Sequence, residues 1–353
     1  MISREVIQKI LEAGVQAPSG ENAQPWQFDA EGNQILLFNI PDRDRSLYNF
    51  RQRGSYIAHG AVIENITTAA KQLGCTPTVT LFPESNRANL VARIMLQEAA
   101  PKEESLYSFI PLRVTNRKLY QNKTVPADVL AALANAGRSE GVKVVLVPDA
   151  ERISTIASAA SVNDQLLLEN KYLHDFFFEH VHWTEKEEQE KRSGFYIKVL
   201  ELPPPAQALF KLFKHWPIMR VLNAVGFAKA GAKQNIKTYA SAGAMAAFIT
   251  ENDSPESFVK VGRAVQQFWL TATSMGLSAQ PLTGILFFNQ RLQVGEGNEF
   301  TLPHQHIIKK AYEEIAGAFG VEGGFVAMMF RIGYADPPSA QSLKMPPVML
   351  AKQ

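Results

Sequence analysis

The sequence predicts an α+β fold in which one chain contains two copies of a single unit. Its 353 residues are enough for roughly two domains. Two long helical stretches ended by glycine align without gaps, because Gly60 to Gly74 and Gly262 to Gly276 both span 14 positions. Any two such helices can be aligned, but here a shorter helix and a strand precede each one and a strand follows, which favours a duplication. We expect two half-copies of one α+β unit.

The first half is assigned to residues 1–97 from apolar periodicity and turn residues. Ser3 suits the N-cap of its first helix and Gly74 the end of its second. Residues 98–110 follow as a linker. The predicted elements of this half are a helix at 7–15, a strand at 35–38, a helix at 58–73, and strands at 79–82 and 90–96.

The second half is assigned to residues 111–353. An insertion at about 160–245 interrupts it and carries much aromatic material, including Phe176–Phe178, Trp183 and Phe210. Such a segment is able to fold over a site as a lid. The predicted elements of this half are a helix at 125–136, a strand at 142–147, a helix at 262–275 and a strand at 326–332.

Composition excludes several classes of function. The formal net charge is only +2, which offers no long-range field to hold nucleic acid or an anionic membrane. Cys75 is the single cysteine, so an intrachain disulfide and a cysteine-based zinc site are excluded. No apolar run approaches the roughly 18 residues of a membrane helix, and the N-terminus lacks the apolar centre of a signal peptide. We expect a soluble, cytoplasmic protein with no nucleic-acid or membrane partner.

The most distinctive segment is residues 17–26, Ala-Pro-Ser-Gly-Glu-Asn-Ala-Gln-Pro-Trp. It combines Pro18 and Gly20, which turn the chain, with Ser19 and Asn22, which offer neutral hydrogen-bonding groups. These suit the edge of a heterocycle or a ribityl chain. From composition alone, an ordinary turn before a buried tryptophan is the simpler interpretation.

Two further segments have the chemistry of a binding site. Residues 113–118, Arg-Val-Thr-Asn-Arg-Lys, place three cations and a hydroxyl where a phosphate would fit, although most such runs are solvated loops. Residues 276–284 turn out of a long helix into Pro-x-x-Gly, which leaves the backbone N–H groups of Thr283 and Gly284 free to face a ligand. A plain connecting loop is the alternative.

Taken together and in this order, the three segments resemble the nitroreductase family of FMN-dependent oxidoreductases. The pattern Ala-Pro-Ser-Gly-x-Asn-x-Gln-Pro-Trp is specific to that family, and Arg-x-Thr-x-Arg and Gly-Leu-x-Ala-x-Pro-x-x-Gly support it. Ordinary members are shorter, and two identical chains share two FMN sites. This chain is similar to the fused single-chain subgroup that includes the mycobacterial Acg-type proteins. The resemblance implies two nitroreductase-like halves, each a small, mostly antiparallel sheet flanked by helices, which form an intramolecular pseudo-dimer.

The resemblance implies roles for the basic residues. Arg113 and Thr115 would hold the FMN phosphate, and Arg117 would lie beside the N1/C2-carbonyl edge of the flavin, where a cation favours the reduced anion. Lys344 matches a C-terminal phosphate cation of the family. The second basic residue expected near it is Ser342 here.

The resemblance also implies contacts from the other two segments. The backbone of Thr283 and Gly284 would face N5 and the C4 carbonyl of the flavin, within the turn Pro281, Leu282, Thr283 and Gly284. Asn170 is a candidate for the amide that the family places near the flavin. The N-terminal half would contribute Pro18, Ser19, Gly20 and Asn22.

Only one of the two possible sites retains its motifs. The first half has no basic phosphate motif, and its counterpart of Pro-x-x-Gly, at 75–79, lacks the glycine. The second half has lost the Pro-Ser pattern at its counterpart, 137–141. The complementary losses predict one complete FMN site per chain and a monomer in dilute solution.

The remaining motifs predict neither a metal site nor a nucleophilic serine. His180-x-His182 and His304-x-His306 lack further ligands at suitable spacing, so no metal site is expected. The Gly-x-Ser-x-Gly string around Ser139 follows a helix and precedes a strand, the reverse of a nucleophile elbow.

The expected function is an FMN-dependent NAD(P)H oxidoreductase. Hydride would pass from NADH or NADPH to flavin N5 and then to an electron-poor small molecule by ping-pong exchange, and no protein residue is expected to be catalytic. The alternative is a protein that stores or sequesters FMN beneath a closed lid. Nitroaromatics, quinones and enones all suit an open flavin face as acceptors.

Overall fold

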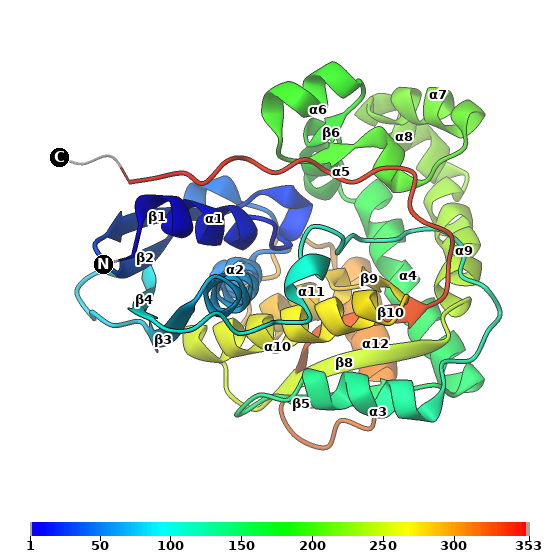
Figure 1. Cartoon of the computed structure of the whole chain (residues 1–353). Helices are drawn as coiled ribbons and strands as arrows, with labels where there is room; N and C mark the ends of the chain where they lie inside the picture. Colours follow the sequence, from blue (N-terminus) through cyan, green and yellow to red (C-terminus); the bar gives the residue numbers. More distant parts are fainter. Residues whose placement is uncertain (1, 351–353) are drawn as a thin grey trace.

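The computed structural model describes residues 2–350 of the chain and contains two four-stranded antiparallel sheets (Figure 1). This is the α+β architecture predicted from the sequence. The N-terminal sheet has the order β1-β2-β4-β3, with β1 at Trp26–Glu31, β2 at Gln34–Asn39, β3 at Cys75–Leu81 and β4 at Leu90–Glu98. The C-terminal sheet has the order β5-β8-β10-β9, with β5 at Lys143–Val147, β8 at Ala244–Thr250, β9 at Ser278–Pro281 and β10 at Phe325–Gly333.

Helices cover the two sheets differently. Along β8, alternate side chains enter two separate cores, as the period of a strand requires. One core lies against α4, α11 and α12 and the other against α3 and α10, so this sheet is buried on both faces. The N-terminal sheet packs one face against α1 and α2. The bounds are α1 Arg4–Gly14, α2 Arg53–Gln72, α3 Ala127–Ala136, α4 Ala150–Glu169, α10 Pro255–Ser274, α11 Gly284–Gln293 and α12 Leu302–Phe319.

The two halves meet where α2 crosses α10. A Cβ built on Gly60 would lie 2.1 Å from the carbonyl oxygen of Val259, and one built on Gly262 would lie 1.9 Å from that of Ile57. Only glycine permits backbones to approach this closely. Gly60 and Gly262 are the two glycines that the sequence alignment paired, so the crossing has the symmetry expected of a fused pseudo-dimer.

The insertion forms a helical layer beside the C-terminal half, coloured green in Figure 1. It extends from the end of α4 to β8 and contains a short parallel pair of strands. Its elements are α5 Lys171–Glu179, β6 Val181–His182, α6 Glu185–Lys191, β7 Phe195–Tyr196, α7 Pro204–Phe213, α8 Trp216–Ala224 and α9 Phe227–Ala240.

The segment after β10 returns across the N-terminal half as an extended strap (Figure 1). The backbone N–H of Phe28 in β1 donates to the carbonyl oxygen of Val348 at 2.8 Å, and the N–H of Leu350 donates to the carbonyl oxygen of Phe28 at 2.6 Å. This path carries Lys344 to the boundary between the two halves.

Several predicted bounds need correction. The long helices begin at Arg53 and Pro255, five and seven residues before their predicted starts. Tertiary contacts set the first start, because Arg53 donates to Gln290 at 2.6 Å and pairs with Asp253. The N-cap at Ser254, followed by a proline, signalled the second. Strand β1, with its alternating burial, was missed. The predicted cap of α1 is confirmed, since Ser3 Oγ accepts from Val6 N at 3.3 Å.

Candidate functional site

The predicted site residues gather around two adjoining cavities between the halves. The larger has a volume of 1010 Å³ and the smaller one of 90 Å³. Predicted residues that line only the larger are Gly20, Pro281, Leu282, Thr283 and Gly284. Those that line only the smaller are Asn22, Arg113 and Lys344, and those that line both are Pro18, Ser19, Thr115 and Arg117. All twelve, drawn from four separate stretches of sequence, therefore lie around two cavities that share part of their lining.

The smaller cavity is lined by three cations, Arg113, Arg117 and Lys344, whose hydrogen bonds go to neutral oxygens. Arg113 is 4% exposed, lies 4.5 Å above the ring of Trp269, and donates through Nη2 to the Gln16 carbonyl at 3.0 Å. Its Nε is buried and has no partner in the structure. Burial lowers the pKa of Arg113 to about 10. A buried guanidinium with an unused donor is a strong potential anion ligand.

Lys344 reaches the same cavity from the C-terminal strap. Its Nζ donates to the Ala17 carbonyl and to Asn22 Oδ1, both at 2.8 Å. Burial, and secondly the positive charge of Arg113, hold the pKa of Lys344 well below its ordinary value. An anion between Arg113 and Lys344 would remove this electrostatic conflict.

The side chain of Asn22 forms hydrogen bonds to two groups of the C-terminal strap. Its Nδ2 donates to the Leu343 carbonyl at 2.9 Å while its Oδ1 accepts from Lys344. The side chain was expected to contact a ligand directly. The side chain lines the smaller cavity and at the same time fixes the strap and the ammonium group of Lys344, in a turn where Asn22 has a φ of 54°.

The basic loop is anchored to the C-terminal sheet. Thr115 forms a parallel bridge with Ala279 of β9, and Asn116 N donates to the Ala279 carbonyl at 3.0 Å. The fully buried Arg331 donates to the Lys118 carbonyl at 2.8 Å. These bonds hold Arg117 at the junction of the cavities, where its Nη1 donates to Val199 at 3.2 Å.

The turn at 281–284 opens helix α11. Gly284 is the first residue of that helix, so its N–H has no acceptor within it. A Cβ on Gly284 would lie 1.9 Å from Asn163 Oδ1, an oxygen that is buried without a partner. Asn163 therefore presents an amide beside the two backbone N–H groups that the sequence singled out.

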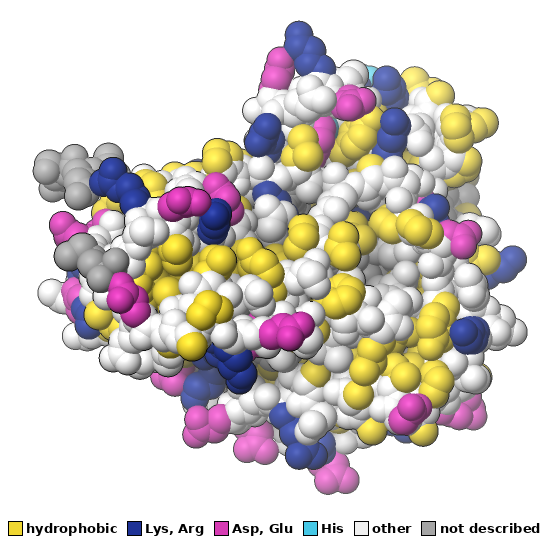
Figure 2. Space-filling view, in the orientation of Figure 1, with side chains coloured by type: hydrophobic (Ala, Val, Ile, Leu, Met, Phe, Trp, Pro, Cys, Tyr) yellow, Lys and Arg dark blue, Asp and Glu magenta, His cyan; other side chains and the backbone are white. Residues whose placement is uncertain are grey.

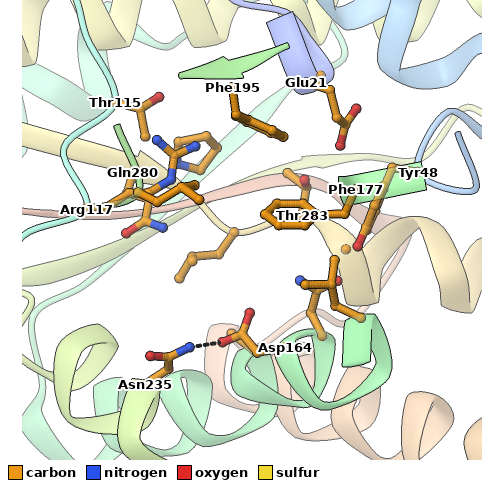
Figure 3. Close-up of a pocket in the computed structure, with 18 of the residues that line it drawn as sticks. Glu21, Tyr48, Thr115, Arg117, Asp164, Phe177, Phe195, Asn235, Gln280 and Thr283 are labelled. Carbon is orange, nitrogen blue, oxygen red and sulfur yellow. Dashed lines mark hydrogen bonds between the residues drawn. The ribbon is translucent and has the colours of Figure 1, made fainter. Parts of the chain in front are cut away.

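The insertion supplies the wall of the larger cavity that faces this turn and the basic loop (Figure 3). Most of that wall is aromatic or aliphatic. Its apolar residues are Leu167, Leu168, Phe177, Phe195, Leu200, Leu202, Phe210, Phe213, Phe227 and Ala232. The sequence predicted aromatic lid material here, and the structure places five of its phenylalanines on the cavity.

Two carboxyl groups, those of Glu21 and Asp164, also line the larger cavity. Figure 3 shows Glu21 and Asp164 on opposite sides of the space. Burial raises the pKa of Glu21 well above its ordinary value, with the negative charge of Asp44 adding to the effect. Burial also raises the pKa of Asp164, although Asn235 Nδ2 and Tyr239 Oη each donate to it at 2.9 Å. Both carboxyls therefore hold a proton to higher pH than ordinary carboxyls do.

Sequence reasoning missed Asn163, Glu21 and Asp164. Glu21 stood inside a quoted motif at a position taken as variable, whereas nothing near Asn163 or Asp164 marks them on helix α4. Asn170, the candidate amide ligand, instead caps α5: its Oδ1 accepts from Leu173 N at 3.1 Å and its Nδ2 donates to the Glu299 carbonyl at 2.7 Å. It lines neither cavity.

The histidine pairs and the Gly-x-Ser-x-Gly string lie in structural roles. His182 Nδ1 lies 2.7 Å from Glu188 Oε2, and His304 Nε2 lies 3.3 Å from Glu169. Across residues 2–350, no three His, Cys, Asp or Glu side chains converge as metal ligands. Ser139 lies in the turn between α3 and β5.

A family model described as the nitroreductase family matches residues 112–334, more than half of the chain. The chain belongs to the nitroreductase family. Among curated proteins, the chain is similar to "Putative NAD(P)H nitroreductase Rv3131" of Mycobacterium tuberculosis, with 26% identity over 94% of this chain and 86% of that protein. It is also similar to "Putative NAD(P)H nitroreductase acg" of the same organism, with 27% identity over 52% of this chain and 55% of that protein.

Other matches differ more in length or sequence. The chain spans 46% of "Uncharacterized protein MT1398" of M. tuberculosis, with 23% identity over 94% of this chain. A solved nitroreductase with bound FMN from Bacteroides fragilis is 13% identical, with a TM-score of 0.39 over 71% of this chain and all of that one. The FMN-dependent nitroreductase NfnB of Mycobacterium smegmatis, solved with NADPH, is 16% identical, with a TM-score of 0.36 over 65% of this chain and 86% of that one.

Proposed function

We propose that this protein is an FMN-dependent NAD(P)H oxidoreductase. The observation that carries the proposal is the pair of cations, Arg113 and Lys344, in a small cavity that adjoins a large, mostly apolar one. A dianionic phosphate matches the first, and a flat, largely apolar ring system matches the second. Membership of the nitroreductase family, and relatives named as NAD(P)H nitroreductases, support the same assignment.

The chain's own groups fit FMN. Arg113 Nε is an unused buried donor, the charge of Lys344 is uncompensated by its hydrogen bonds, and the N–H of Gly284 begins a helix. FMN, when bound, accepts a hydride from a nicotinamide and passes it to a second substrate. Arg113 and Lys344 would hold the phosphate, and Thr115 would add a hydroxyl donor.

The remaining residues would orient the ring and set its surroundings. Arg117 would supply positive charge near the reduced ring, stabilising it electrostatically. Thr283 and Gly284 would donate backbone N–H groups, and Asn163, in place of Asn170, would offer its free amide oxygen. The phenylalanines of the insertion would exclude water from the exposed face.

The test is to purify the full chain, record its absorbance, and quantify flavin released by denaturation against protein. Reconstituted protein is then mixed with NADH or NADPH and with nitroaromatic, quinone or enone acceptors. Bound FMN reduced by a nicotinamide and reoxidised by an acceptor supports the proposal. A chain that binds no FMN on reconstitution would contradict it.

A storage or sequestering protein is the second candidate. The observation that favours it is the number of insertion side chains on the cavity wall, including Phe177, Phe210 and Phe213, which would cover the flavin. In that case bound FMN would resist reduction by NADH and NADPH while remaining reducible by a small chemical reductant. Rapid reduction by a nicotinamide excludes this candidate.

We also propose one FMN site per chain and a monomeric pseudo-dimer with halves at 1–97 and 111–353 joined by a linker at 98–110. The α2–α10 crossing supports this arrangement, because it already buries the surface that two separate chains would share. Light scattering should give a mass near 39.1 kDa, and released flavin should approach one per chain. A stoichiometry near two would contradict the single site.

A further inference from the structure

The outer side of helices α7 and α8 carries large apolar side chains in contact with solvent. Exposure is 50% for Leu209, 51% for Leu212, 67% for Val221 and 82% for Val225, with Ile218 at 39%. Ile218, Val221 and Val225 are three and four residues apart, which places them on one face of α8 and its C-terminal end. Figure 2 shows hydrophobic side chains gathered over α7 and α8. Apolar residues grouped in this way mark an interaction surface.

Cations surround these residues without carboxylates among them. Lys211, Lys214 and Arg220 are exposed within α7, α8 and the turn between them. We call these three cations and the five apolar residues the α7–α8 surface. Charge is segregated along the insertion: residues 202–250 contain six Lys or Arg and no Asp or Glu. The other three, Lys229, Lys233 and Lys237, follow at i, i+4 spacing along one exposed face of α9.

The carboxylates of the insertion lie on other elements. On α5 and α6, lysines pair with acids along the same helix, as in Lys171–Asp175 and Lys186–Glu190. Figure 1 shows α6 on the side of the insertion opposite α7 and α8. The α7–α8 surface is therefore both apolar and locally cationic, although the whole chain has a net charge of only +2.

We propose that the α7–α8 surface docks the protein onto an anionic lipid bilayer. Helices with exposed leucines and valines flanked by Lys and Arg lie in the interface of such bilayers, where apolar side chains enter the headgroup boundary and cations meet phosphate. A second copy of this chain is a poorer occupant. A two-fold contact through this surface would bring Lys211, Lys214 and Arg220 against the same cations of the other copy.

Docking of this kind needs no spanning segment. Within residues 2–350, no helix combines the length and apolar character required to cross a bilayer. The sequence-level expectation of no membrane partner rested on the net charge of the chain. The proposal revises that expectation at one surface, because a local cluster of charge acts within a Debye length of about 10 Å at moderate salt.

The test uses the full-length protein and vesicles of phosphatidylcholine, with or without phosphatidylglycerol, in a sedimentation assay. We expect binding to the anionic vesicles and much weaker binding to the neutral ones. Raising the salt to about 1 M, where the Debye length is about 3 Å, should weaken binding strongly. Because binding is read by sedimentation, the outcome does not depend on flavin content or turnover.

Two sets of variants locate the surface. Replacing Lys211, Lys214 and Arg220 together by Gln should lower affinity for anionic vesicles roughly a hundred-fold, since each cation near a bilayer contributes about five-fold. Its matched control replaces Lys186 and Lys191 of α6 by Gln and should leave affinity within a few-fold.

The apolar part of the surface is tested separately. Val221→Ser with Val225→Ser should weaken binding, whereas Leu302→Ser, at a similarly exposed position (79%), should not. Circular dichroism and thermal unfolding confirm that each variant folds.

Three outcomes would overturn the proposal. One is no binding of the wild-type protein to anionic vesicles at low salt. Another is a loss of vesicle binding in the α6 control variant that is as large as the loss in the α7–α8 variant. The third is concentration-dependent dimerisation that Val221→Ser with Val225→Ser abolishes while vesicle binding is unchanged, which would assign the surface to a second copy.

Discussion

The two adjoining cavities select a ligand by different means. The 90 Å³ cavity is lined by three cations, Arg113, Arg117 and Lys344, whose positions are fixed by hydrogen bonds to neutral oxygens. The 1010 Å³ cavity is mostly apolar, and its polar lining mixes amide, hydroxyl and carboxyl side chains with two cations, Arg117 and Lys118. Charge therefore dominates the first cavity and shape the second. Changes to the small cavity should alter affinity for a phosphate, while changes to the large one should alter what can reach the ligand.

The largest effect is expected from removing the phosphate of the ligand. Riboflavin lacks every contact to the small cavity, and each hydrogen bond between charged groups contributes about 1.5–3 kcal/mol. Losing two or more of them should weaken binding by more than about a hundred-fold relative to FMN. Titration of the apoprotein with each flavin, followed by fluorescence, measures the difference. Equal affinities would remove the phosphate roles of Arg113 and Lys344.

A single cation should account for part of that difference. Arg113→Ala removes one charge-assisted contact and should weaken FMN binding about ten- to a hundred-fold, with little effect on riboflavin. The matched control is Arg138→Ala, an exposed arginine in the counterpart segment of the other half-site, 137–141. An Arg113→Ala protein with unchanged FMN affinity would return residues 113–118 to the status of a solvated loop.

Replacing Asn22 should have a smaller effect on FMN affinity, because Asn22 acts by positioning Lys344. Asn22→Ala removes one acceptor of the ammonium group and one donor to the strap, at about 0.5–1.5 kcal/mol for each hydrogen bond. We expect FMN affinity to fall several-fold and the Tm to fall with it. Asn22→Asp should weaken FMN binding further, because a carboxylate beside Lys344 would neutralise it. Unchanged FMN affinity in both variants would show that Asn22, from the N-terminal half, does not contribute to FMN binding.

The smallest expected effect is proton uptake on binding. In the free protein, burial and Arg113 lower the pKa of Lys344. A bound phosphate, dianionic above a second pKa of about 6, would raise that pKa again. The bound state then holds more protons, so FMN affinity should fall as the pH rises from the lowered pKa of Lys344 towards the ordinary lysine value of about 10.4. Calorimetry in buffers of different ionisation enthalpy measures the uptake, which Lys344→Gln should abolish.

Much of the fold followed from local signals in the sequence. The helix starting after Ser3, the strands β2 and β4, and the paired glycines of α2 and α10 are all marked by caps, periodicity or turn residues. The extra turns at the start of α2 carried no such signal, because contacts of Arg53 with Asp253 and Gln290 from the other half stabilise them. Strand β3 begins four residues early and includes Pro77, which its edge position tolerates.

The site residues also divide into those that local sequence signals identify and those that depend on tertiary contacts. Segments rich in Pro, Gly, Ser and Arg were identified from the sequence, and the structure brings them together. Asn163 and Asp164 were not found, because on a helix nothing distinguishes a residue that faces a cavity from one that faces solvent until the neighbouring elements are placed. Asn170 was chosen for its amide, but the local geometry uses that amide to cap α5.

The path of the C-terminal strap sets the order in which the site can be assembled during synthesis. Pro18 and Ser19 are made first, residues 113–117 and 281–284 much later, and Lys344 after all of them. A nascent chain therefore has a large apolar cavity before its second phosphate cation, and retention of the cofactor should be a late, post-synthetic step. Until the strap pairs with Phe28, Arg113 would be in place without Lys344, and the maturing protein would hold FMN more weakly than the finished one.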